Sequence, residues 1–275
     1  MLDSHHHLWN YSAEEYPWIP AGSPLARDQL LPELDAATMA AGVDGTVVVQ
    51  ARQVLAESDW LLGLAAQSEV IKGVVGWVPL VDAEVGTELE RLAPEKKFKG
   101  VRHVLQEEAD GYFLRDDFHR GLALLPGFDL RYDLLLFQRQ LPVAIKLVDR
   151  QPDLGIIVDH IAKPEIRPGR VEDDWKRGMR ELAQRDNILG VKFSGVVTEF
   201  PEGPVDAGTV RAYFEETLDI FGPEHVMFGT DWPVCLLRID AYRDWAGTVR
   251  ELVGALSKDE QDAILTGNCR RAYGL

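Results

Sequence analysis

Two histidines near the start of the chain are spaced to act together on a metal ion or on a proton. His5 and His7 lie in the apolar segment Leu2–Trp9, and side chains two positions apart in a β-strand point to the same face. Paired imidazoles at the end of a strand often begin a metal or catalytic site, because a neutral ring nitrogen binds Zn²⁺ or accepts a proton. His6 has the opposite parity, so we expect it to be a structural residue.

Ionisable and hydrogen-bonding residues also stand in or just after other apolar, β-branched runs of the chain. A buried ionisable group costs free energy unless it is paired or functional, so this placement predicts a functional site. Aromatic side chains flank the first and the last of these runs. The candidate site residues, besides His5 and His7, are Gln50, Arg102, Gln106, Tyr132, His160, Asp231, Trp9 and Trp232.

Three residues in these runs have competing interpretations. Asp231 directly follows the run Val226–Thr230, a position that favours a functional carboxylate over a helix cap. Lys192 has either a catalytic role or an outward position, from which its aliphatic chain extends past a helix to water. His103 follows Arg102, so parity places the two side chains on opposite faces.

Eight short apolar runs alternate with amphipathic segments, the pattern of βαβ units. The predicted strands are Leu2–Trp9, Gly45–Ala51, Ile71–Leu80, Phe98–Gln106, Leu130–Phe137, Leu154–His160, Ile188–Gly195 and His225–Asp231. The predicted helices are Gln29–Ala41, Ser58–Ser68, Gln138–Arg150, Val171–Arg185, Val210–Phe221 and Ala241–Ala255.

Near-continuous apolar strands are typical of parallel sheets buried on both faces. Eight βα units in a chain of 275 residues match the size of a (β/α)8, or TIM, barrel. We therefore predict an α/β fold, a single (β/α)8 barrel domain over residues 1–275. A doubly wound open sheet is the alternative, but no GxGxxG motif follows the first run, so we expect no nucleotide cofactor. Barrel chemistry lies at the carboxyl ends of the strands, where the candidate residues fall.

The composition excludes several classes of partner. The formal net charge is −16, which argues against nucleic acid and anionic membrane surfaces because both attract basic proteins. The two cysteines, Cys235 and Cys269, form no CxxC pair, so we expect neither a thiolate zinc site nor a redox motif. No signal peptide or membrane span is evident. We expect a cytoplasmic protein with a small-molecule substrate, and the sequence leaves open whether it forms a homo-oligomer.

Seven short motifs, taken in order, resemble the amidohydrolase-related (family 2) group of the amidohydrolase superfamily. The resemblance is to sugar lactonases of the L-fuconolactonase and L-rhamnonolactonase type and covers nearly the whole chain. The motifs are Asp3–Trp9, Tyr16–Trp18, Lys99–His103, Val158–Pro164, Lys192–Glu199, Phe228–Pro233 and Gly267–Tyr273.

The resemblance implies a distorted (β/α)8 barrel hydrolase with one candidate metal site. A single Zn²⁺ would be held by His5, His7, His160 and Asp231. Two-metal relatives use a bridging lysine or glutamate on the fourth strand and often a histidine on the fifth. This chain has Val101–Val104 and Arg131–Leu134 there, so we do not expect a two-metal site. Some relatives in this group work without metal, so the metal requirement stays open.

The reaction that the resemblance implies is hydrolysis of a sugar-acid lactone to the free acid. Asp231 would be the base that activates water, while His160, Arg102 and the His5/His7 pair, or one metal ion, polarise the carbonyl. Gln50, Gln106, Tyr132, Trp9 and Trp232 are the expected substrate contacts. The alternatives are a zinc-dependent decarboxylase, or another metal-dependent hydrolase of the group, and a non-catalytic small-molecule-binding barrel.

Overall fold

Eight parallel strands in sequential order form the centre of the structure, a computed structural model that describes residues 1–275. The strands are β1 (Leu2–His6), β2 (Gly45–Val49), β3 (Ile71–Gly76), β4 (Phe98–His103), β5 (Arg131–Leu134), β6 (Ile156–Val158), β7 (Ile188–Phe193) and β8 (Val226–Phe228). The sheet closes between its first and last strands just beyond the end of β8. There the Asp231 N–H donates to the His5 carbonyl at 2.8 Å, and the His7 N–H donates to the Trp232 carbonyl at 2.7 Å.

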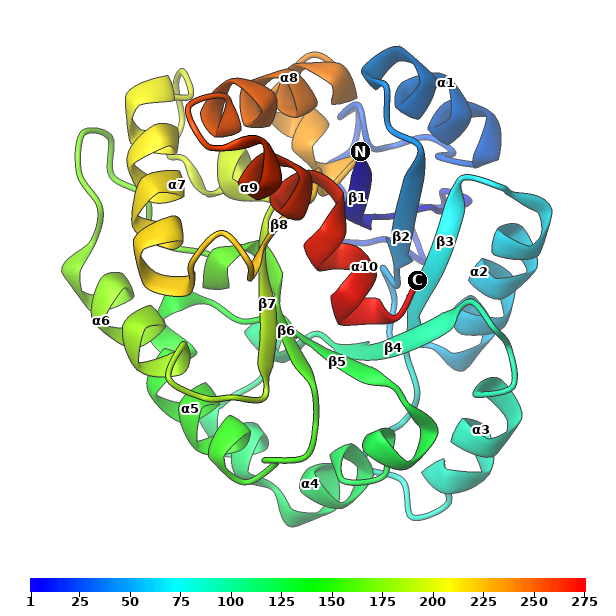
Figure 1. Ribbon diagram of the computed structural model, residues 1–275. Coiled ribbons are helices and arrows are strands. Elements are labelled where there is room, and N and C mark those ends of the chain that lie inside the picture. Colours follow the sequence, from blue (N-terminus) through cyan, green and yellow to red (C-terminus); the bar gives the residue numbers. More distant parts are fainter.

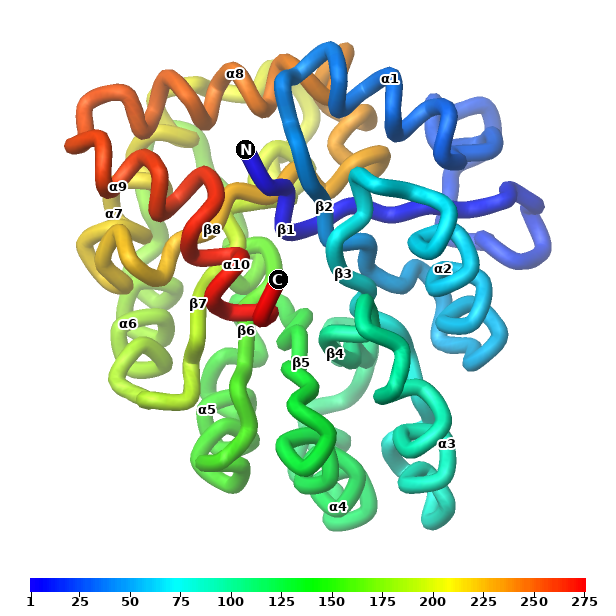
Figure 2. The backbone as a smooth tube through the Cα atoms, turned by 45° about the vertical axis from the view of Figure 1, so that its right-hand side comes forward, coloured from blue at the N-terminus to red at the C-terminus, as the bar shows by residue number.

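Helices surround the barrel on its outer side, except for the last one, α10, which lies across one end (Figures 1 and 2). They are α1 (Leu31–Ala41), α2 (Leu55–Gln67), α3 (Val85–Leu92), α4 (Asp116–Leu122), α5 (Leu141–Asp149), α6 (Asp173–Leu182), α7 (Ala207–Phe221), α8 (Tyr242–Val253), α9 (Lys258–Asp262) and α10 (Asn268–Tyr273). The predicted (β/α)8 barrel is confirmed, although α3, α4, α9 and α10 were not predicted from the sequence. None of the helices is both long and apolar enough to cross a membrane.

All eight predicted strands exist, but each ends two to four residues earlier than predicted at the carboxyl side. The end of β6 shows why. Strand pairing stops at Val158, and Asp159–Ala162 turn in a short helical loop. Apolar and β-branched residues mark the part of a strand that pairs. The polar residues after it have left the sheet, which allows their side chains to converge over the barrel.

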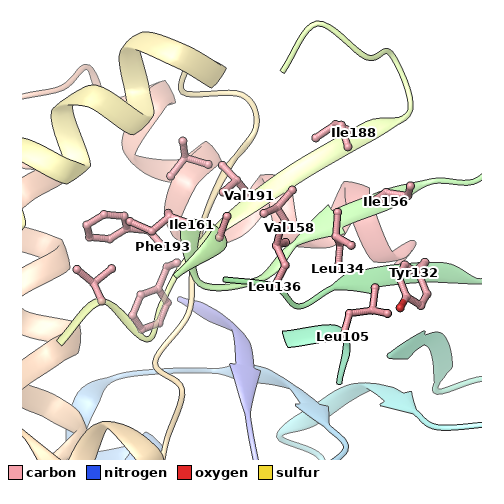
Figure 3. Packing of buried hydrophobic residues seen from close by; sticks show 14 of the residues in the cluster. Leu105, Tyr132, Leu134, Leu136, Ile156, Val158, Ile161, Ile188, Val191 and Phe193 are labelled. Carbon is pink, nitrogen blue, oxygen red and sulfur yellow. The ribbon is translucent and has the colours of Figure 1, made fainter. Parts of the chain in front are cut away.

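The apolar residues form two layers because successive strand residues face opposite sides. Ile156 and Val158 belong to the large cluster between strands and helices (Figure 3). Ile157, between them, belongs to a small cluster inside the barrel. Three residues of α10 complete that inner cluster, which consists of Leu2, Val47, Val49, Val75, Ile157, Met227, Cys269, Ala272 and Tyr273. The C-terminal helix α10 therefore fills one end of the barrel (Figure 1).

His6 faces away from the barrel interior, as its parity predicts. Its Nε2 lies 3.0 Å from Thr46 Oγ1, and its ring lies near the ring of Trp232. The side chain is fully buried. Burial, helped by the charge of His7, lowers the pKa of His6 to about 3.

Replacing His6 by Asn should lower the stability of the protein at neutral pH. It should also make the protein lose less stability as the pH falls. At pH 7 the lost packing and hydrogen bond should lower the free energy of unfolding by about 1–3 kcal/mol. Between pH 6.5 and 3 the unfolded chain binds a proton at His6 that the folded chain does not, so wild-type stability falls as pH falls through this window. At pH 4 the wild-type protein has lost about 3 kcal/mol of its free energy of unfolding in this way. The His6→Asn variant should not show this loss. Urea unfolding at pH 7 and pH 4 measures both effects; equal pH sensitivity of the two proteins would contradict the assignment.

Candidate functional site

The two predicted imidazoles face each other at the carboxyl end of β1. His5 Nε2 lies 3.3 Å from His7 Nε2. His7 Nδ1 lies 2.8 Å from the Val49 carbonyl oxygen, which only accepts, so Nδ1 carries a hydrogen. The other ring nitrogen of His7 lies 3.3 Å from Asp231 Oδ1. A carboxylate oxygen and a ring nitrogen at this distance need a proton or a metal ion between them.

Asp231 stands beside this pair because the barrel closes there. Its backbone N–H binds the His5 carbonyl, and its backbone lies in the left-handed region at φ 57°. Burial raises the pKa of the Asp231 carboxyl, but His160, His7 and Lys163 outweigh burial and hold it below its ordinary value. The carboxylate is therefore ionised at neutral pH and can accept a proton.

His160 approaches Asp231 from the loop after β6. Its Nε2 lies 3.8 Å from Asp231 Oδ1, and its Nδ1 lies 2.9 Å from Ser194 Oγ. A Cβ at position 195 would lie 2.6 Å from His160 Nδ1, so Gly195 leaves the room that the ring needs. Burial lowers the pKa of His160 to about 4, although the charges of Asp231 and Asp159 oppose this. The imidazole is neutral at neutral pH.

The loop that carries His160 has an uncommon backbone. Four consecutive residues, from His160 to Lys163, have φ between 43° and 59°. Each such residue costs roughly 1–2 kcal/mol relative to the right-handed conformation. A strained run of this kind is retained where surrounding structure holds it, and such runs concentrate at functional sites. The strain therefore points to the same place as the polar residues.

Arg102 reaches the pair from β4 on the inner face. Its Nη1 lies 3.1 Å from His5 Nε2 and donates to Asp159 Oδ2 at 3.1 Å. Its Nη2 donates to the Gln50 backbone carbonyl and, at 3.2 Å, to Gln50 Oε1. Gln50 is fully buried, and its side chain supports the guanidinium. His103 points outward onto Tyr112, as its parity predicts.

A buried charge network below His5 was not predicted from the sequence. Lys192 Nζ lies 2.5 Å from Asp133 Oδ2, 2.8 Å from Asp159 Oδ1 and 3.1 Å from His5 Nδ1. Tyr273 Oη of α10 donates to Asp133 at 2.8 Å. The four members of this network, Lys192, Asp133, Asp159 and Tyr273, are all buried.

Lys192 therefore faces the barrel interior, and its outward alternative is wrong. Burial opposes its charge, but Asp133 and Asp159 raise the pKa of Lys192 above its ordinary value. Burial raises the pKa of Asp159, yet Lys192, His5 and Arg102 bring it well below the ordinary range. In the structure Asp133 pairs in register with Arg102, so the two share a face.

Four residues that were expected to contact substrate, Gln106, Tyr132, Trp9 and Trp232, lie in different parts of the structure. Gln106 is partly exposed at the barrel mouth, where its Oε1 accepts from Lys163 at 3.1 Å. Tyr132 points outward toward Phe118 because its neighbour Asp133 takes the inward position. Trp9 is buried below the N-terminal segment and donates to the Arg27 carbonyl at 3.0 Å.

Trp232 also turns away from the site. It packs near His6 and lines a separate pocket of about 220 Å³ between α1 and α8. The Asp231 and Trp232 side chains point to opposite sides of the chain, and the Trp232 carbonyl accepts from the His7 N–H where the barrel closes. The structure thus brings together His5, His7, Arg102, His160 and Asp231, and it leaves Tyr132 and Trp232 outside the group. The Trp9 ring stacks against the His7 ring, with their centres 6.5 Å apart.

The donor set near Asp231 fits a zinc ion. Ligands about 2.0–2.2 Å from one tetrahedral Zn²⁺ lie about 3.3–3.6 Å apart. The distances of 3.3 Å for His5–His7 and 3.3 Å for His7–Asp231 lie in this range, and that of 3.9 Å for His5–Asp231 is slightly longer. His160 groups instead with His5 and Asp159. Three of the four ligands implied by the resemblance therefore form one compact group, and His160 stands beside it.

Comparison with known proteins places the chain among enzymes of one family. Residues 2–275 match the family described as Amidohydrolase (Amidohydro_2). The L-fucono-1,5-lactonase of Burkholderia multivorans is 38% identical over 288 residues, covering 100% of this chain and 96% of that protein. The L-fucono-1,5-lactonase of Burkholderia ambifaria is 31% identical, covering 99% and 94%.

A solved structure agrees with this comparison. A Burkholderia multivorans amidohydrolase, crystallised with bound zinc, superposes with a TM-score of 0.93 and 37% identity. The match covers 100% of this chain and 99% of that one. With a match to nearly every residue and two full-length relatives above 30% identity, this chain belongs to the amidohydrolase (Amidohydro_2) family.

Proposed function

We propose that this protein hydrolyses a sugar-acid lactone to the free aldonic acid. The observation that supports this most is the ionised, buried Asp231 carboxylate held against His7 and next to His160, with the Arg102 guanidinium against the neighbouring His5. A base beside several cationic or hydrogen-bonding groups suits attack of water on an ester carbonyl. The full-length relatives named L-fucono-1,5-lactonase favour a six-membered lactone of this kind as substrate.

In the proposed reaction Asp231 takes a proton from water while the water oxygen attacks the lactone carbonyl carbon. The carbonyl oxygen becomes an oxyanion, which the Arg102 guanidinium and the neighbouring imidazoles stabilise. When the intermediate collapses, the bond between the carbonyl carbon and the ring oxygen breaks. Asp231 then returns its proton to the ring oxygen, and the open-chain acid leaves.

His5 Nε2 is shared between two roles in this proposal. A Zn²⁺ bound by His5, His7 and Asp231 would polarise the carbonyl and make bound water more acidic. However, His5 Nε2 has one lone pair and lies 3.1 Å from Arg102 Nη1. It cannot accept from the guanidinium and bind a metal at the same time.

Replacing Arg102 by Met should therefore raise zinc affinity about tenfold or more. The change frees the His5 lone pair and removes a positive charge next to the ligands, and both effects favour a divalent cation. Isothermal titration of the metal-stripped protein with Zn²⁺ measures this. Arg120→Met, on the surface of α4, serves as the control. Equal or weaker binding by Arg102→Met would contradict the shared role of His5.

The proposed function is tested with a pH-indicator screen of sugar lactones, run with and without chelator. Turnover that resists chelator supports a lactonase that needs no metal, and loss that Zn²⁺ reverses supports a one-metal lactonase. Carbon dioxide release from aromatic carboxylic acids, without lactone turnover, would instead indicate a decarboxylase. Lactone binding without turnover would indicate a non-catalytic barrel. We propose a cytoplasmic location for the enzyme.

A further inference from the structure

Three polar residues at the mouth of the barrel form a cluster that the proposed reaction does not use. Gln106, Lys163 and Glu199, here called the rim cluster, follow β4, β6 and β7 respectively. Lys163 Nζ lies 3.1 Å from Gln106 Oε1 and 3.3 Å from Glu199 Oε1. The ammonium also lies 5.2 Å from the centre of the Phe137 ring. One cation is thus held between an amide, a carboxylate and an aromatic face.

The rim cluster is adjacent to the reacting groups. Lys163 comes three residues after His160 in the left-handed turn, and residues three apart in a turn of this tightness lie on the same side. The charge of Lys163 contributes to the lowered pKa of Asp231. Burial raises the pKa of Glu199, and the charge of Asp231 adds to that effect. These couplings place the cluster within electrostatic reach of the proposed base.

The hydrogen-bonding capacity of the cluster exceeds what its internal contacts use. An ammonium has three hydrogens and a carboxylate has about four acceptor sites. The internal contacts of Lys163 to Gln106 and Glu199 account for two of the hydrogens. The Lys163 and Glu199 side chains are 18% and 15% exposed, so a ligand reaches them and water competes only in part. A donor and an acceptor side by side match a hydroxyl group, which both accepts and donates.

We propose, on the basis of the proposed lactonase function, that the rim cluster is a subsite for the hydroxyl groups of the lactone ring. A ring hydroxyl accepts a hydrogen bond from Lys163 and donates one to Glu199. A site built to pair with hydroxyls rejects a ligand that lacks them, because its own polar groups then stay unpaired. The cluster therefore selects polyhydroxylated lactones over plain cyclic esters.

The test compares L-fucono-1,5-lactone with δ-valerolactone, a cyclic ester of the same ring size without hydroxyls on the other ring carbons. Lys163→Met and Glu199→Gln should each lower kcat/KM for the sugar lactone about 10- to 100-fold, mainly through KM. Values for δ-valerolactone should change less than threefold at pH 8, where the Asp231 carboxyl, whose pKa is already below its ordinary value, stays ionised without the Lys163 charge. If its turnover is too slow to follow, its inhibition constant against the sugar lactone replaces the rate. Lys258→Met, at an exposed ion pair on α9, is the matched control.

Each outcome of this comparison either supports or overturns the proposed subsite. Selective loss on the sugar lactone, with Lys163→Arg restoring part of it, supports the subsite. Equal losses on both lactones overturn it, because the residues then serve the chemistry or the fold. Unchanged kinetics with the sugar lactone also overturn it. Absence of hydrolysis of every lactone by the wild-type protein overturns the proposed function itself, and is recognised before any variant is compared.

Discussion

Replacing Asp231 by Asn should lower kcat for lactone hydrolysis by about 10²–10⁴ while the protein stays folded. The amide has nearly the same shape as the carboxylate but cannot take a proton from water, and a positioned general base contributes a factor of this size. The wild-type carboxyl has a lowered pKa, so the base form is present at neutral pH and only the variant lacks it. Initial rates and thermal unfolding, measured on one preparation of each protein, test this.

The chain contains a matched control for this substitution. Asp129 also has a left-handed backbone, with φ 57°, but its side chain is 89% exposed. Asp129→Asn should therefore change neither the rate nor the unfolding temperature appreciably. If Asp231→Asn kept more than a few per cent of the wild-type rate, Asp231 would not be the base. A large drop in its unfolding temperature would instead indicate a structural carboxylate.

Replacing Lys192 by Met should lower the free energy of unfolding by about 3–5 kcal/mol and greatly reduce activity. The change leaves the buried carboxylates of Asp133 and Asp159 without their shared cation, and an uncompensated buried charge is strongly destabilising. Asp159 also contacts His5 Nδ1 at 3.3 Å and Arg102, so the loss of its partner disturbs the site above it. Urea unfolding and initial rates measure the two effects.

Two further variants separate the network from simple loss of a lysine. Lys192→Met combined with Asp133→Asn removes one cation and one carboxylate together, and should recover part of the lost stability. Lys176→Met breaks an exposed ion pair with Asp173 and should cost less than about 1 kcal/mol. If Lys192→Met were no more destabilising than Lys176→Met, the buried network would not stabilise the barrel.

The fold was predictable because two simple sequence patterns indicate its strands and helices. Near-continuous apolar runs such as Ile156–Val158 mark strands buried on both sides, and amphipathic segments such as Leu141–Asp149 mark the helices between them. Parity was equally informative at the start of the chain. It separated His6, which faces outward to Thr46, from the His5/His7 pair, and the position of Asp231 after β8 gave it a place beside that pair.

The contacts between strands were not predictable in the same way. Whether Lys192 meets Asp133 or points to a helix depends on the facing of β7 relative to β5, which a single strand does not encode. Tyr132 was assigned to the site because it is polar and lies in a strand, although its register with Val101 turns it outward. A hydroxyl on a large aromatic ring fits both layers, so residue type alone does not choose between them.

The ends of the strands show a second limit. Composition suggests that β6 continues through His160, yet its pairing ends at Val158 and the left-handed turn follows. None of the four residues from His160 to Lys163 is a glycine, and glycine is the usual sign of that conformation. Tertiary contacts, such as that of His160 with Ser194, hold the turn. This is why Lys163 and the rim cluster emerge only from the structure.

The most direct test of the lactonase proposal is acid release from L-fucono-1,5-lactone by freshly purified protein, followed with a pH indicator and corrected for spontaneous hydrolysis. We expect a rate proportional to the concentration of wild-type protein and reduced at least 10²-fold in Asp231→Asn. No release above the spontaneous rate, in the presence or absence of added Zn²⁺, would contradict the proposal. Equal rates for the wild-type protein and Asp231→Asn would contradict the assigned site.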